Sequence, residues 1–173
     1  RTAGFASISQ SGLTNGSKLL ASMLMIIGGS PAGTAGGIKT TTVAVLLLTA
    51  ISVLRGNKDT ECYGRKITFE IIRVGITITL VTFVFWLFGV TVMTVIEPQQ
   101  KVLDLMFEAT SAMATVGLTV DLTPVLSDIS HVVLMLMMYI GRIGPMTMAL
   151  IFSGHVDKKN QFRTLPEAKI MVG

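Results

Sequence analysis

The chain has 173 residues, of which 50% are hydrophobic and only 14% are charged. A soluble domain carries about 25% charged residues, and here the charges are confined to a few loops between long uncharged runs. This composition argues against a soluble domain and predicts a membrane protein with several spans. The net charge of +4 does not indicate nucleic-acid binding, because the basic residues flank apolar runs without interleaved aromatic residues.

The chain opens with a Thr-x-Gly segment at residues 2–4, followed by a polar connector and a long apolar stretch from Leu19 to Leu54. As one straight helix this stretch would be longer than a bilayer is thick. Its middle, Gly28 to Gly37, holds five glycines and a proline, which cannot form a stable helix. We therefore expect two helices, Leu19 to Ile27 and Thr40 to Leu54, joined by an irregular loop at membrane depth. Such a loop persists only when it is buried in protein or lines a watery cavity.

Two later stretches are long enough to span a membrane, Val74 to Ile96 and Val132 to Gly154. The second contains one charge, Arg142. An intramembrane Arg costs roughly 2.5–3.5 kcal/mol, so we expect it to pair with an acid or with carbonyls of the glycine-rich loop. The segment Val102 to Thr115 is too short to span, and its small residues favour a helix that dips into the membrane and returns.

The basic residues predict the orientation. The loop from Arg55 to Lys66 and the tail after Gly154 are rich in Lys and Arg, whereas Glu97 to Ser130 is mostly acidic. The positive-inside rule places the first two in the cytoplasm and the third outside a cell membrane that the chain crosses several times. Asp121 and Asp128 would then lie near the outer mouth, where they could concentrate cations or simply belong to a solvated loop.

The chain repeats itself at a shift of 113 residues. This shift places Thr2 on Thr115, Gly4 on Gly117, Phe5 on Leu118 and Gly28 on Gly141. Each copy has a Thr-x-Gly-apolar segment, a polar connector and an interrupted membrane helix. The re-entrant helix precedes only the second copy, so we expect the chain to be part of a longer protein.

A re-entrant helix followed by a Thr-x-Gly strand suits cation conduction. The carboxyl end of the helix carries partial negative charge, and the carbonyls of the strand can replace the hydration shell of a cation. Glycine allows the backbone to turn those carbonyls inward. A four-fold filter would need four such strands, and two are present. The candidate filter residues are Thr2, Ala3, Gly4, Phe5, Thr115, Val116, Gly117 and Leu118.

Five segments together resemble the Ktr/Trk/HKT superfamily of potassium transporters. They are residues 1–5, 28–40, 114–119 and 141–145, together with the tail 165–170, which is similar to the ending of bacterial Ktr proteins. The resemblance covers essentially the whole chain. It implies an all-α polytopic membrane protein with four pore-loop repeats of helix, pore helix, filter and helix. The chain would hold the end of repeat three and all of repeat four.

The expected organisation follows from this resemblance. Residues 1–54 would form the third filter strand and its broken inner helix, and residues 55–66 a cytoplasmic loop. Residues 67–154 would form the fourth pore repeat, and residues 155–173 a cytoplasmic tail. Both visible filter positions are glycine, which favours potassium over sodium in this superfamily.

The resemblance also implies a gate and partners. The glycine-rich loop would obstruct the pore below the filter, and Arg142 would contact it and hold the closed state. The transporter would be a homodimer that binds a ring of cytosolic nucleotide-binding regulatory subunits. It would carry no cofactor, with K⁺ as the permeant ion and Na⁺ as a candidate activator. The candidate gate residues are Gly28, Gly29, Ser30, Gly33, Gly36, Gly37, Lys39 and Arg142.

Two functional classes compete. One is a potassium conduit with a filter and an intramembrane gate, and the other is a sodium/potassium symporter with a discrete midplane site and alternating access. The two copies run in the same direction, which favours a pore around a central axis over an inverted-repeat transporter. An enzyme is a distant third, because the sequence has no Ser/His/Asp set or metal-ligand cluster within its spans.

Overall fold

The computed structural model describes residues 4–30, 36–57 and 59–143 of the chain. Thr2, Ala3 and Gly33, the expected tail 155–173 and the second half of the expected span Val132 to Gly154 lie outside these residues. The described part is mostly helical. Its elements are η1 (Gln10–Gly12), α1 (Asn15–Ile26), α2 (Thr40–Leu54), β1 (Glu61–Cys62), β2 (Arg65–Lys66), α3 (Phe69–Ile96), α4 (Val102–Met113), η2 (Thr123–Val125) and α5 (Asp128–Ile143).

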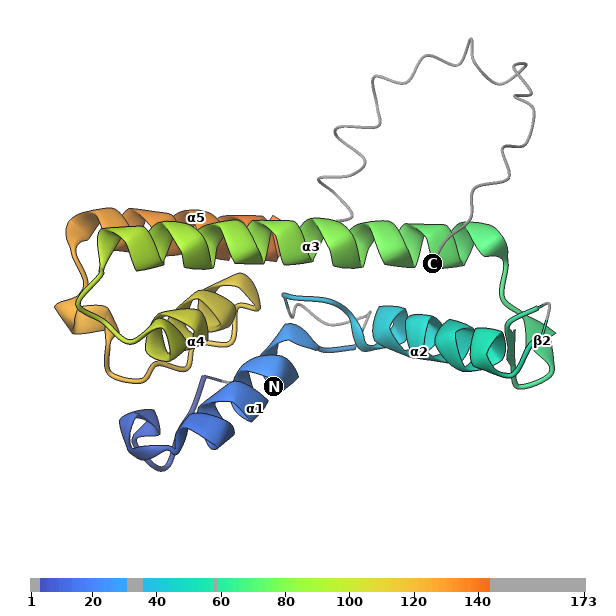
Figure 1. Ribbon diagram of the computed structural model, residues 1–173, viewed down its shortest axis with the longest axis horizontal. Helices are drawn as coiled ribbons and strands as arrows, with labels where there is room; N and C mark the ends of the chain where they lie inside the picture. Colours follow the sequence, from blue (N-terminus) through green and yellow to red (C-terminus); the bar gives the residue numbers. More distant parts are fainter. Residues whose placement is uncertain (1–3, 31–35, 58, 144–173) are drawn as a thin grey trace, which may run out of the picture.

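The long helix α3 is the spine of the fold (Figure 1). Within the described residues it is the one helix long and apolar enough to cross a membrane, and α2 is a shorter apolar helix. Helix α2 packs along the first half of α3, and α5 packs along the second half. Helix α4 fits between α3 and α5 on one side and α1 on the other. The short helix α4 therefore occupies the centre of the helical assembly.

The helix boundaries agree with the sequence-based expectations in the middle of the chain and differ at three starts, of which one is α5, which begins at Asp128 instead of Val132. Helix α2 has the expected bounds, and α4 begins at the expected residue. Helix α1 begins at Asn15 instead of Leu19, because the Thr14 hydroxyl caps it by accepting a bond from the Ser17 N–H at 3.3 Å. Helix α3 begins at Phe69, five residues before the uncharged run, so its first turns carry charged residues.

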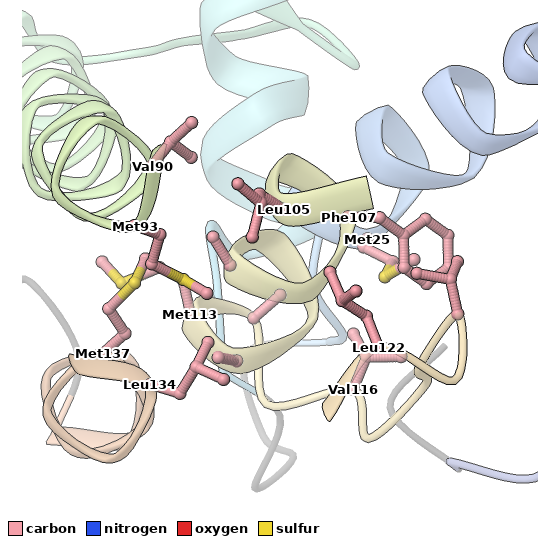
Figure 2. Close-up of a cluster of buried hydrophobic side chains, with 14 of the residues drawn as sticks. Met25, Val90, Met93, Leu105, Phe107, Met113, Val116, Leu122, Leu134 and Met137 are labelled. Atoms are coloured by element: carbon pink, nitrogen blue, oxygen red, sulfur yellow. The ribbon is translucent and has the colours of Figure 1, made fainter. Parts of the chain in front are cut away.

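The core is concentrated around α4 (Figure 2). Leu105 and Phe107 on α4 and Met93 on α3 are completely buried. Glycine permits two close approaches in this core: a Cβ on Gly141 would lie 1.9 Å from the carbonyl oxygen of Met113, and one on Gly89 would lie 2.4 Å from the sulfur of Met137. The carboxyl end of α4 is thus packed directly against the backbone of α5.

The loop between α2 and α3 contains a β-hairpin that the sequence patterns do not predict. Its two-residue turn, Tyr63–Gly64, has positive φ angles of 49° and 73°, as a type I′ turn requires. An exposed ion pair between Lys66 and Asp59, at 2.6 Å, lies beside it. The hairpin gives a defined shape to the segment expected in the cytoplasm.

Candidate functional site

The glycines of the two Thr-x-Gly segments meet in space. Both glycines adopt positive φ angles, 69° at Gly4 and 84° at Gly117. A Cβ on Gly117 would lie 3.4 Å from the Cα of Gly4, and a Cβ on Gly4 would lie 3.1 Å from the carbonyl oxygen of Val116. The backbones of two segments that are equivalent in the repeat are therefore in direct contact. Side chains at either glycine would be strained by the left-handed backbone.

The second segment is held against α4 by Ser111. The Val116 N–H donates to the Ser111 carbonyl, and the Leu118 N–H donates to the Ser111 hydroxyl, each at 2.9 Å. The Val116 side chain enters the core, whereas Gly117 is exposed. Both bonds use N–H groups of the segment, so they fix the strand without engaging its carbonyl oxygens.

The glycine-rich loop has a closed neck. The Gly28 N–H donates to the Ile38 carbonyl at 2.8 Å, and the Ile38 N–H donates to the Ile26 carbonyl at 3.1 Å. A third bond joins the Thr40 N–H to the Gly29 carbonyl at 3.2 Å. A Cβ on Gly28 would lie only 2.1 Å from the Gly36 carbonyl oxygen. The loop therefore leaves and re-enters the fold at one point.

This neck touches the second Thr-x-Gly segment. The Gly36 N–H donates to the Thr115 hydroxyl at 3.1 Å, and a Cβ on Gly36 would lie 2.6 Å from that oxygen. Gly37, with a φ of 74°, packs against the Ala114 side chain. Thr115 itself has a positive φ of 52°, which is uncommon for a β-branched residue. The structure thus brings the candidate filter and the candidate gate loop together at Thr115.

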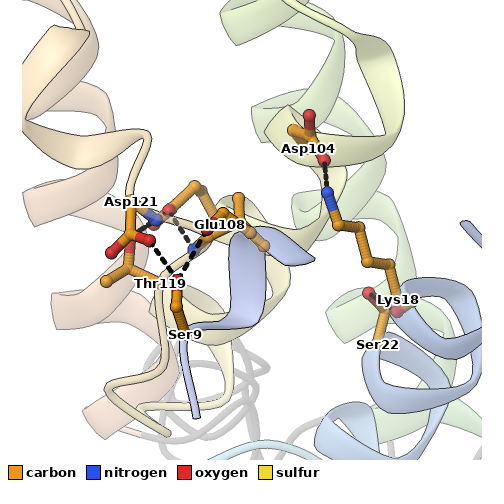
Figure 3. A network of polar contacts seen from close by, with 9 residues as sticks. Ser9, Lys18, Ser22, Asp104, Glu108, Thr119 and Asp121 are labelled. Carbon is orange, nitrogen blue, oxygen red and sulfur yellow. Dashed lines mark hydrogen bonds and ion pairs between the residues drawn. The ribbon is translucent and has the colours of Figure 1, made fainter. Parts of the chain in front are cut away.

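A buried carboxylate organises the chain after the second segment (Figure 3). Glu108, on α4, is 5% exposed. It accepts bonds from the Val120 N–H at 3.0 Å, from the Thr123 hydroxyl at 3.1 Å and from the Thr119 hydroxyl. The sequence patterns do not single out Glu108, although an acid inside an apolar re-entrant helix is itself a signal.

Two further polar contacts join segments that are distant in sequence (Figure 3). The Ser9 hydroxyl donates to the Asp121 carboxylate at 2.5 Å, and hydrogen bonds from Ser9 and then Ser11 lower the pKa of Asp121. Lys18, near the start of α1, forms an ion pair with Asp104, in the first turn of α4, at 2.7 Å. Neither contact is apparent from the sequence.

The remaining predicted residues take different positions. Phe5 is almost fully exposed and Leu118 is half-buried. Arg142, Thr115, Gly117 and Glu108 line one cavity of about 570 Å³. The predicted contact between Arg142 and the glycine-rich loop stays a prediction, since residues 31–35 lie outside the described part. Ser30 is exposed near the neck, and Lys39 is an exposed residue at the start of α2.

Within residues 4–30, 36–57 and 59–143, no group of three or more His, Cys, Asp or Glu side chains could hold a metal ion. The polar groups gathered at the site are backbone amides and carbonyls, hydroxyls and isolated carboxylates. Potassium filters coordinate their ion with backbone carbonyls, so this donor set suits a weakly held monovalent cation.

The described helices, one of them long and apolar enough to cross a membrane, and the contact between Gly4 and Gly117 define a helical protein with a candidate ion pathway. The family model of TrkH, described as a cation transport protein, matches residues 1–163. The chain belongs to this family, whose members are membrane transporters of cations and not enzymes.

The chain is similar to curated proteins along its whole length. It is 36% identical over 173 residues to the Ktr system potassium uptake protein B of Bacillus subtilis (strain 168), covering 100% of this chain and 38% of that protein. It is 35% identical over 176 residues to the potassium/sodium uptake protein NtpJ of Enterococcus hirae, covering 100% of this chain and 39% of that protein. The Ktr system potassium uptake protein B of Vibrio alginolyticus is 33% identical over 153 residues, covering 88% of this chain and 33% of that protein. The chain therefore spans less than half the length of these relatives.

Proposed function

We propose that the chain is the C-terminal part of an ion-translocating subunit that takes up potassium across the cell membrane. In this proposal the two Thr-x-Gly segments are two strands of a four-strand filter. The loop from Gly28 to Gly37 is the gate beneath it. The names of the Bacillus and Vibrio relatives, potassium uptake proteins of a Ktr system, support the substrate and membership of a multi-component system.

The contact between Gly4 and Gly117 carries the proposal. Two equivalent glycines lie in contact, and both have positive φ angles at which a side chain would be strained. Backbones that approach this closely can present carbonyl oxygens to one dehydrated ion. A four-strand filter would need two further strands from the remainder of the longer protein.

The contact between Gly36 and Thr115 supports the proposal that the glycine-rich loop is the gate. The neck of the loop lies against the residue that precedes the filter valine and glycine, where a loop can block the ion path. Arg142 lines the same cavity as Thr115 and would help to hold this closed arrangement. In this proposal the hairpin loop and the tail lie in the cytoplasm, where they would meet nucleotide-binding regulatory subunits of a homodimer. Na⁺ remains a candidate activator, and the Enterococcus relative is named a potassium/sodium uptake protein.

The test uses the full-length transporter in bacteria that lack their own potassium uptake systems. We expect growth at low external potassium and uptake of K⁺ in preference to Na⁺. Absence of K⁺ uptake by a protein that reaches the membrane would contradict the proposal. Slow, saturating uptake with a fixed ratio of Na⁺ to K⁺ would instead support the symporter alternative.

A further inference from the structure

The proposed filter and gate give no role to the buried ion pair between Lys18 and Asp104. The two charged groups are 2.7 Å apart, and their side chains are only 8% and 20% exposed. Removing two charges from water costs several kcal/mol per ion in a protein, and the mutual attraction repays this only with good geometry. An apolar pair of similar volume would serve packing equally well, so stability alone does not account for these residues.

The pair joins the two repeats at one specific place (Figure 3). Lys18 lies near the start of α1, the helix that follows the first Thr-x-Gly segment. Asp104 lies in the first turn of α4, the helix that leads into the second segment. The buried Ser22 hydroxyl donates to the Lys18 carbonyl and braces the same turn of α1. The ion pair therefore links the supports of two strands that come from different repeats.

The same two supports also meet at their other ends. The chain leaving α1 enters the neck of the glycine-rich loop, and Gly36 in that neck bonds to Thr115 just after α4. Helix α1 is thus tied to α4 by an ion pair at its beginning and by a neutral hydrogen bond beyond its end. The Gly4 and Gly117 backbones of the two segments also lie in contact.

We infer that Lys18 and Asp104 are a positioning pair that sets the spacing of the two filter strands, and thereby the preference for K⁺ over Na⁺. The inference rests on the proposed function. The charged pair has a single favourable geometry, whereas an apolar contact could slide. A filter discriminates between ions of similar charge by the arrangement of its oxygens, so a small displacement of one strand alters selectivity more than it alters total flux.

The experiment measures K⁺ and Na⁺ uptake per transporter in the membrane, using the full-length protein. The single variants are Lys18→Met and Asp104→Leu, and the double variant K18M/D104L leaves no unpaired charge that could prevent folding. The charge-swapped variant K18D/D104K restores the pair. Both residues lie near the start of their helices, where a positive charge is unfavourable. The swap moves that positive charge from the start of α1 to the start of α4, so the total effect of the helix dipoles stays similar. Lys66→Met, at the exposed pair with Asp59, is the matched control.

We expect the single variants and the apolar double variant to lower the K⁺/Na⁺ uptake ratio by about tenfold, which corresponds to about 1.4 kcal/mol of lost discrimination. The charge swap should recover most of the ratio, and Lys66→Met should leave it unchanged. An unchanged ratio in the apolar double variant, or a loss that the charge swap does not recover, would overturn the inference. Failure of the wild-type protein to take up K⁺ would contradict the proposed function instead.

Discussion

Gly36 donates its backbone N–H to the hydroxyl of Thr115 at 3.1 Å, across 79 positions of sequence. This bond is the direct link between the glycine-rich loop and the second Thr-x-Gly segment. It joins a residue without a side chain to Thr115, whose φ is positive. Under the proposed function, it is one of the contacts that hold the loop against the filter.

Replacing Thr115 by Val should weaken this contact and increase K⁺ uptake. Valine has the shape of threonine but no acceptor oxygen, which leaves the Gly36 N–H without this partner at a cost of about 1–3 kcal/mol. Initial uptake rates in cells measure the effect. Thr91→Val is the control, because the Thr91 hydroxyl bonds to the carbonyl of Leu87 within α3. Equal rates for the two variants would contradict a holding role for the bond.

Replacing Gly117 by Ala should lower selectivity for K⁺. A non-glycine residue in the left-handed region costs roughly 1–2 kcal/mol, and relief of that strain would move the strand. Gly56→Ala is a matched control, since Gly56 has a similar φ of 72° but no atoms within 4 Å of an added Cβ. Both variants should lose similar thermal stability, and only Gly117→Ala should change the K⁺/Na⁺ uptake ratio. A changed ratio in both would assign the effect to general destabilisation.

The backbone of this chain was largely predictable from its sequence. The glycine-rich stretch interrupts a helix where glycine and proline are dense, and α2 begins at Thr40 as expected, because local composition decides such boundaries. The start of α1 was predicted too late. The cap at Thr14 depends on one hydroxyl, which hydropathy does not register.

The contacts that organise the site were not predictable. Whether Glu108 meets Thr119 and whether Lys18 meets Asp104 depends on how α4 packs between α1 and α5. A hydrophobic pattern specifies which face of a helix is buried but not which distant loop lies against it. The shift of 113 residues predicted equivalence of the two glycines, whereas their contact follows from packing.

Replacing Glu108 by Gln should destabilise the segment that follows the filter. An amide has one acceptor oxygen where the carboxylate has two, so at least one of the donors from Val120, Thr119 and Thr123 loses its partner. We expect a loss of about 1–3 kcal/mol, measured as a lower melting temperature of the purified transporter, with greater Na⁺ uptake. The exposed Glu61→Gln is the control. Equal melting temperatures for the two variants would exclude this anchoring role.

Acid should destabilise the connection between Ser9 and Asp121. Hydrogen bonds from Ser9 and Ser11 lower the pKa of Asp121 below its ordinary value of 3.8. A lowered pKa means that the stabilising contribution is complete above the ordinary value and is lost as the pH falls through the lowered one. Melting temperatures of the purified protein between pH 6 and the most acidic tolerated pH, about 3, measure this effect. Asp121→Asn should be less stable at pH 6 and less sensitive to acid; identical pH profiles would refute the assignment.

Acid should also weaken the hydrogen bonds that Glu97 accepts at the start of α5. Hydrogen bonds from Ser127, and then from Ser130, lower the pKa of Glu97 below its ordinary value of 4.5. The Glu97 carboxylate accepts the Ser127 N–H at 2.8 Å, just before α5 begins. Glu97→Gln should therefore flatten the acid dependence below pH 4.5 and increase amide exchange at the start of α5. Unchanged exchange there would contradict this capping role.

The three backbone bonds that close the neck between Ile26 and Thr40 have a mechanical consequence. Because the chain enters and leaves the loop at one point, α1 and α2 would not have to move if the loop acts as the proposed gate. Gating by this loop would then be a local motion, within the nanosecond-to-microsecond range of loops, rather than a slower tilt of whole helices. The outline that the transporter presents to lipid would stay constant, so bilayer thickness should have little influence on how often the pathway opens.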